Sequence, residues 1–148
     1  MRTKSIRSRI RLRVQFAVPR RGIPGATALR RWALAARGDL AEVTLRIVGA
    51  REARSLNRTF GKIDRATNVL SFSYGGRQGD VVLCHPVIAR QARAQRKALA
   101  AHYAHLVVHA MLHLRGHDHG KKMRASRMES AEIRILRRFG LGNPYELK

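Results

Sequence analysis

The sequence predicts an α+β fold, in which a four-stranded mixed sheet packs with about five helices in a single compact domain. The first observation is the length of 148 residues, which suits one domain. The second is the composition, because hydrophobic residues make up 45% of the chain and can form a core. The third is the order of the periodic segments, since strand-like and helix-like patterns alternate along the chain.

Four segments have the pattern of strands. Residues 10–18, IRLRVQFAV, alternate apolar and polar side chains, as a half-buried strand does. The β-branched segment 41–49 places Val43, Leu45 and Ile47 on one side. The glycine-rich GGRQG lacks the Gly-Lys-Ser/Thr ending of a phosphate-binding loop, so it predicts a turn between the last two strands. The expected strands are 10–18, 41–49, 67–74 and 80–84.

Helical periodicity fills the segments between and after these strands. Pro86 suits the first turn of a helix, and Gly140 suits the residue that ends one. Trp32 and Cys84 are interpreted as core residues. One helical stripe consists of Leu99, Tyr103, Leu106, Ala110 and Leu114. The expected helices are 26–36, 50–60, 86–114 with a break in the basic region 93–98, and 122–139.

The charge of the chain is extreme, because 31 Lys and Arg against 9 Asp and Glu give a net charge of +22. Net charge indicates partners and solubility rather than fold. A polyphosphate such as RNA or DNA is the natural partner, since neutralising its phosphates releases counterions. A solvated basic surface and an anionic membrane surface are the two alternatives.

The sequence contains no apolar run long enough to be a signal peptide or a membrane span. We therefore expect no membrane partner and a cytoplasmic location. Cys84 is the one cysteine, which excludes an intrachain disulfide and fits a reducing compartment. Residues 1–9 are basic and are expected to form a flexible lead-in, with residues 10–148 forming the single domain.

The histidines are concentrated in one part of the chain. Of the seven, those at 102, 105, 109 and 113 are spaced so that they share one face of a helix. The i,i+4 pair His109 and His113 can hold one divalent ion, although such a pair also arises by chance. Gly116 is expected to end the helix in a left-handed conformation and to lead His119 back toward the pair. His105 is interpreted as a hydrogen-bonded neighbour rather than a ligand.

Three nitrogen ligands leave a fourth position for water, which is typical of catalytic rather than structural zinc sites. The zinc-protease motif H-E-x-x-H has a glutamate where this chain has Ala110, so peptide hydrolysis is poorly supported. Either a metal-bound water is the nucleophile, because the ion lowers its pKa to about 7, or the ion acts as a Lewis acid on the phosphoryl oxygen, and the sequence does not separate the two. The positive charge of the chain favours a phosphodiester substrate, with arginines stabilising the developing charge.

The stretch HAMLHLRGHDH, residues 109–119, resembles the H-G-x-L-H-L-x-G-Y-D-H signature of the YbeY-type endoribonucleases, a family of bacterial rRNA maturation factors. The resemblance extends over roughly residues 40–146. Its further blocks are LNRTFGKIDRATNVLSF at 56–72, GDVVLC at 79–84, AHYAHLVVH at 101–109, MESAEIRIL at 128–136 and NPY at 143–145.

The resemblance implies an endoribonuclease specific for single-stranded RNA that uses one zinc ion and no small-molecule cofactor. It also implies action in 16S rRNA 3′-end maturation and ribosome quality control, with rRNA and ribosomal particles as partners. The metal ligands of the family fall on His109, His113 and His119. Asp118 and His117 are candidate helpers of the chemistry; His117 stands where the family has an aromatic residue, and it either replaces the ring, competes as a ligand or helps move protons.

Two positions depart from the family or leave a role open. The family carries an arginine linked to RNA cleavage where this chain has Gly61, and Lys62 or Arg65 is the candidate substitute. Asp80 is interpreted as a strand cap or as a partner of a metal-binding histidine. Gly61 keeps a second reading open, in which the protein is a non-catalytic, basic RNA-binding factor of ribosome assembly with a structural metal site. The oligomeric state stays open.

Overall fold

Four strands form one mixed sheet, as the sequence predicts. The structure is a computed structural model that describes residues 9–61, 65–118 and 125–146, with the side chains of residues 117, 118 and 125 outside the description. Neighbouring strands follow the order β1-β2-β4-β3, with β1, β2 and β4 parallel and β3 antiparallel to β4. The strands are β1 (Arg11–Phe16), β2 (Glu42–Val48), β3 (Val69–Gly75) and β4 (Gln78–Cys84).

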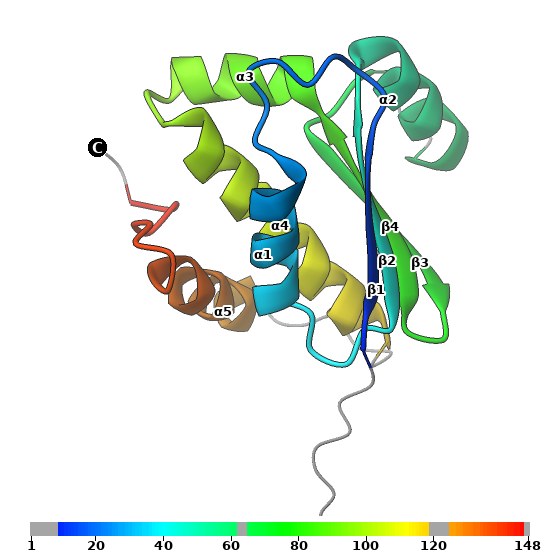
Figure 1. Cartoon of the computed structure of the whole chain (residues 1–148), viewed down its shortest axis with the longest axis vertical. Helices are drawn as coiled ribbons and strands as arrows, with labels where there is room; N and C mark the ends of the chain where they lie inside the picture. Colours follow the sequence, from blue (N-terminus) through cyan, green and yellow to red (C-terminus); the bar gives the residue numbers. More distant parts are fainter. Residues whose placement is uncertain (1–8, 62–64, 119–124, 147–148) are drawn as a thin grey trace, which may run out of the picture.

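The helices cover the two faces of the sheet unequally. Figure 1 shows α1, α4 and α5 together on one side of the sheet, with α2 on the other side near the carboxyl ends of the parallel strands. This arrangement, with five α-helices in the described residues, confirms the predicted fold class. The helices are α1 (Ala26–Ala35), α2 (Ala50–Leu56), α3 (His85–Ala94), α4 (Leu99–Asp118) and α5 (Ala125–Arg137), and a π-helical turn, η1 (Asn57–Gly61), follows α2.

The main core lies between the sheet and α4. Alternate residues of the central strands, among them Leu45 and Leu83, are completely buried against the helical side. The predicted stripe of α4 meets them, with Tyr103 and Leu114 completely buried. Trp32 belongs to the same cluster, whereas Cys84 is buried in a smaller cluster under α2, so both are core residues as expected. The helix that carries the histidines is therefore also the main support of the sheet.

The predicted breaks and turns are confirmed by the backbone. Arg96 adopts a φ of 55° between α3 and α4, and the Lys97 N–H donates to the Ala92 carbonyl at 2.9 Å. Gly140 ends α5 in the same way, with a φ of 75°. Three successive residues of the glycine-rich segment have positive φ and form the β3–β4 turn, namely Gly75, Gly76 and Arg77.

The predicted helix 50–60 is confirmed as α2 followed by the π-helical η1, where the buried Asn57 side chain donates to the Arg65 carbonyl at 3.0 Å. One local expectation is wrong. Gly116 does not end α4, which continues to Asp118. A glycine inside a helix costs only about 1 kcal/mol relative to alanine, and the buried leucines that precede it hold the helix against the core. His117 and Asp118 therefore belong to the last turn of α4.

The expected flexible lead-in 1–9 falls, except for Arg9, outside the described residues. Within the described residues, no helix has the length and apolar character required to cross a bilayer.

Replacing Gly79 by alanine tests the contact between β4 and α4. A Cβ at this buried glycine would lie 2.7 Å from Leu114 Cδ2 and 2.8 Å from the Phe72 carbonyl oxygen. Because the backbone oxygen cannot turn away, we expect Gly79→Ala to lower the free energy of unfolding by about 1–3 kcal/mol, measured by urea denaturation. Gly142→Ala is the control, since a Cβ there meets nothing within 4 Å. Equal stability of the two variants would contradict the tight packing.

Candidate metal centre

Helix α4 carries a continuous row of four imidazole rings. The ring centroids of His102 and His105 are 6.4 Å apart, those of His105 and His109 are 6.1 Å apart, and those of His109 and His113 are 6.3 Å apart. The last pair is nearly parallel, with an angle of 15° between the ring planes. The prediction that these four histidines share one helical face is confirmed.

A buried carboxylate of α5 meets the middle of this row. His105 Nε2 lies 3.1 Å from Glu132 Oε1, and His109 Nδ1 lies 2.9 Å from Glu132 Oε2. The Tyr145 hydroxyl donates a further hydrogen bond to Glu132 Oε1. Glu132 itself is completely buried. Both histidine nitrogens act as donors here, because an ionised carboxylate can only accept.

The ionisation of Glu132 follows from these three donors. Burial raises the pKa of Glu132, but the hydrogen bonds from His105, His109 and Tyr145 outweigh that effect and lower the pKa to about 2. Burial and the bond to Glu132 raise the pKa of Tyr145, so its hydroxyl stays protonated and keeps donating. The cluster therefore holds a negative charge inside a strongly basic protein.

Two sets of ligand atoms share His109. The first set is described in full: the nearest ligand atoms of His105, His109 and Glu132 all lie within 4.8 Å of one another and could hold a metal ion. The second set is the predicted one, His109 with His113 and His119. His109 uses Nδ1 toward Glu132, which leaves Nε2 free to face a ligand. His113 is exposed at the end of the row, and His119 lies outside the described residues.

The remaining predicted site residues are only partly placed. The backbone of His117 and Asp118 is helical, but their side chains lie outside the described part, as does Lys62. Arg65 is exposed, and its carbonyl accepts from Asn57. A Cβ at Gly61 would clash with Asn57 Oδ1, so a larger residue there would require the Asn57 side chain to move.

The interpretation of Asp80 as a partner of a metal-binding histidine is wrong. Its carboxylate accepts a hydrogen bond of 2.7 Å from the Tyr74 hydroxyl. Successive side chains of a strand point to opposite faces of the sheet. The side chain of Val81, the next residue of β4, packs on the α4 side, so Asp80 faces the other side. The bond to Asp80, with burial, raises the pKa of Tyr74 to about 12.

Sequence reasoning missed Glu132 and Tyr145 as parts of the centre, although both lie in blocks that carry the family resemblance. One signal was present. Glu132 follows Met128 by four residues and precedes Leu136 by four, so it interrupts the apolar face of an amphipathic helix. A carboxylate on that face must be paired, and in a chain with 9 acidic residues its position was informative.

His102 has a separate, structural environment. It is 4% exposed, and its Nε2 lies 2.9 Å from Gln91 Oε1, which also accepts from Asn68 Nδ2 at 3.1 Å. Burial, together with the nearby Lys97 and His105, lowers the pKa of His102 to about 4. This ring is therefore neutral at physiological pH and joins α3, α4 and the chain before β3.

The fold and this histidine–carboxylate cluster define an α+β protein with a candidate metal centre on its central helix. The sequence profile described as Endoribonuclease YbeY matches residues 27–140. A protein named endoribonuclease YbeY from Aromatoleum aromaticum is 50% identical over 150 residues, covering 97% of each chain. One of the same name from Thiobacillus denitrificans is 48% identical over 141 residues, covering 92% of this chain and 96% of that one. The chain belongs to the endoribonuclease YbeY family, as its motifs indicated.

A solved structure supports the fold independently. The solution structure of a protein from Thermotoga maritima aligns with a TM-score of 0.59 at 19% identity, covering 91% of this chain and 99% of that one. At this identity the likeness concerns the fold alone.

Replacing Glu132 by glutamine tests the hydrogen bonds that join α4 to α5. An amide has one acceptor oxygen and no charge, so it cannot accept from all three donors. We expect Glu132→Gln to lower the free energy of unfolding by about 2 kcal/mol in urea denaturation. Glu129→Gln, at a partly buried position of the same helix, is the control and should change stability by less than about 0.5 kcal/mol. A larger loss in the control would argue against the role of Glu132.

The pH dependence of stability tests His102. Its pKa falls from 6.5 to about 4 on folding, so the unfolded chain binds more protons between these pH values. The stability from this group is complete above pH 6.5 and is lost as the pH falls toward 4, by at most about 3 kcal/mol. Urea denaturation at several pH values gives the free energy of unfolding as a function of pH, and this free energy should change less with pH for His102→Gln than for the wild type. An equal change with pH in both proteins would mean that His102 is not held neutral by burial.

Proposed function

We propose that this protein is a metal-dependent endoribonuclease that hydrolyses single-stranded RNA. The observation that carries the proposal is the hydrogen bond of 2.9 Å between His109 Nδ1 and the buried carboxylate of Glu132, with the parallel ring of His113 one turn further. A carboxylate behind a histidine is the usual way in which a protein fixes the tautomer and orientation of a metal ligand. The names of the relatives support the RNA substrate.

His109, His113 and His119 are the proposed metal ligands. The bond to Glu132 places the proton of His109 on Nδ1 and leaves the Nε2 lone pair for the ion. His113 is exposed, and its ring lies nearly parallel to that of His109, with 6.3 Å between the ring centroids. His119 directly follows Asp118, the last residue of α4, so it is close to His113 along the chain. Three imidazoles suit zinc, which is the ion we propose.

The alternative donor set, His105 with His109 and Glu132, is less suitable for the ion. Its three groups already satisfy one another by hydrogen bonds of 3.1 Å and 2.9 Å. A metal ion there would need the Nδ1 proton of His109 and the Nε2 proton of His105 removed. In the proposal, Glu132 is therefore a positioning residue, and His105 with Tyr145 stabilises its charge.

The residues around the centre bind and orient the substrate. When bound, the ion supplies Lewis acidity at the scissile phosphate and activates the attacking water. Arg65 is exposed, with its backbone held by Asn57, and offers a guanidinium to the phosphate in place of the arginine that Gly61 replaces. Asp118 and His117, on the last turn of α4, are the proposed proton carriers.

The wider assignment follows the family resemblance and the charge. A net charge of +22 suits a large polyanion such as ribosomal RNA. We propose that the protein acts in the cytoplasm on rRNA within ribosomal particles, in 16S rRNA 3′-end maturation and ribosome quality control. As proposed from the sequence, residues 10–148 form the one catalytic domain behind a flexible basic segment.

One observation favours a second candidate function. The Asn57 side chain fills the space that a side chain at Gly61 would need, so an arginine there would have to displace Asn57. Without a cation at the scissile phosphate, the same centre would be a structural metal site in a basic RNA-binding factor of ribosome assembly.

Metal analysis and RNA cleavage decide between these assignments. We expect purified wild-type protein to contain about one zinc ion per chain and to cleave labelled single-stranded RNA until a chelator is added. His113→Ala should lose both the zinc and the cleavage. His105→Ala is the matched control, and it should keep the zinc because His105 lies outside the proposed ligand set.

The contradicting outcomes are distinct. Zinc retained in His113→Ala but lost in His105→Ala would assign the ion to the set that includes Glu132. Full zinc content without any RNA cleavage would favour the structural metal site. Cleavage that persists in both His109→Ala and His113→Ala would come from a contaminating nuclease.

A further inference from the structure

Arginine side chains gather along one flank of α5, at the junction of α1, α4 and α5. Positions 127, 134 and 138 fall within about 40° of one another around the helix axis and so form a single row. At 1.5 Å per residue, the successive intervals are about 10 Å and about 6 Å. The members are Arg127 and Arg134 of α5, Arg138 directly after it, Arg115 of α4 and Arg31 of α1, which we call the α5 arginine row.

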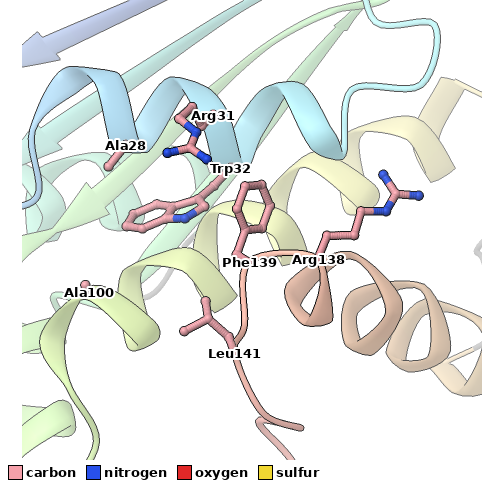
Figure 2. Close-up of a pocket in the computed structure, with 7 residues that line it drawn as sticks. All are labelled: Ala28, Arg31, Trp32, Ala100, Arg138, Phe139 and Leu141. Carbon is pink, nitrogen blue, oxygen red and sulfur yellow. The ribbon is translucent and has the colours of Figure 1, made fainter.

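The surface beneath this row is hollowed at both ends. Near the end of α5, a hollow of about 370 Å³ is lined by Arg31 and Arg138 together with Trp32 and Phe139. Figure 2 shows Trp32 and Phe139 side by side there, with the Arg31 guanidinium next to them and the Arg138 side chain extending over α5. The Arg31 guanidinium carbon lies 5.8 Å from the centre of the Phe139 ring.

Near the start of α5, a second hollow of about 470 Å³ is lined by the remaining three arginines of the row. Two serine hydroxyls, of Ser126 and Ser130, complete its polar lining. The row thus connects an aromatic hollow with a second one, whose lining combines these polar groups with the apolar side chains of Leu112, Ala131 and Ile135. Ordered phosphates and an adjoining base or ribose are the groups that these two linings suit.

Among the described residues, no carboxylate lines this surface. Neither hollow is lined by an Asp or Glu residue, and in the described part of the chain Arg127, Arg134 and Arg138 have no ion-pair partner. Elsewhere an arginine does form an ion pair: Arg46 Nε lies 2.7 Å from Glu52 Oε2. Several like charges on one concave surface raise the local potential and favour a polyanion.

The row is separate from the metal centre. Around the axis of α5, positions 127, 134 and 138 lie about 120° or more from Glu132, which points to the histidines of α4. Helix α5 thus presents its carboxylate to the metal centre and its arginines to a different surface. A ligand on the row would not cover the histidine row.

We propose that the α5 arginine row binds the phosphate backbone of RNA at a second site, away from the point of cleavage. About three successive phosphates are held by Arg127, Arg134 and Arg138, and the aromatic hollow receives an adjoining base. The proposal rests on the proposed function only in taking RNA as the polyanion. If the proposal is correct, an RNA long enough to contact both the row and the metal centre is bound more tightly than a short RNA that contacts only the metal centre.

The test compares two variants that lose equal charge. The row variant is Arg127→Gln/Arg134→Gln/Arg138→Gln. The control is Arg11→Gln/Arg13→Gln/Arg51→Gln, at three exposed positions on β1 and α2. The probe is labelled single-stranded RNA of about 30 nucleotides, which exceeds the length covered by a single small binding site. Binding is measured at several salt concentrations with the full-length protein.

For the row variant, we expect affinity to fall about tenfold or more near physiological salt. The slope of log affinity against log salt should become shallower by about 2, since each lost contact with a single strand contributes about 0.7. The control should keep the wild-type slope. An equal loss of RNA affinity in both variants would mean that only the total charge matters and not the position of the row, and it would overturn the proposal. An inorganic polyphosphate that binds the wild type as tightly as RNA of equal charge would also overturn it.

Cleavage separates this proposal from the proposed function. With the long RNA, the row variant should raise KM about tenfold and leave kcat unchanged, while RNA of about 6 nucleotides should show neither effect. A raised KM for the short RNA would place the row at the cleavage point and contradict a second site. If the wild type cleaves no RNA, the proposed function fails, and the binding measurement still decides the role of the row.

Discussion

The buried carboxylate of Glu132 is the constraint on which the site and much of the helical layer depend. An ionised carboxylate without partners inside a protein costs several kcal/mol, so its three donors must be held in place together. His105 and His109 come from α4, and Tyr145 comes from the chain after α5. The hydrogen bonds that satisfy the charge therefore also set the distance between α4 and α5.

Helix α4 contributes to both the core and the candidate metal centre, because its two faces carry different residues. On one side of α4, buried apolar residues such as Tyr103 and Leu114 pack against the sheet. The close approach depends on Gly79 of β4, where Leu114 lies too near for any side chain. On another side, the histidine row begins with a structural ring, His102, and ends with the exposed His113. A rigid, well-packed helix is a suitable support for metal ligands, because ligand geometry tolerates little movement.

Much of the fold could be predicted, because the strands and helices follow from local periodicity. The alternation in 10–18, the apolar stripe of α4 and the stop at Gly140 depend on residues close together in the sequence. The shared face of the four histidines was predictable for the same reason. Expectations failed where tertiary contacts decide. The role of Glu132 depends on partners 23 and 27 residues earlier in the chain.

One smaller error has the same origin. Glycine is common at the ends of helices, but the packing of α4 against the sheet continues the helix past Gly116. A local preference of about 1 kcal/mol is smaller there than the tertiary contacts that oppose it. The predicted helix 50–60 is helical throughout, although its last turn, from Asn57, is a π-helix.

The positions of the arginines in the structure are more informative about RNA binding than their total charge. A total charge of +22 attracts any polyanion and distinguishes no surface from another. Position matters on α5, where one flank carries the buried Glu132 with its three donors and another flank carries arginines over two hollows that no described carboxylate lines. Charges of opposite sign on two flanks of one helix keep a polyanion off the carboxylate side except where a metal ion neutralises it. The distribution therefore favours an RNA that is held by the arginines and reaches the histidines by a separate segment.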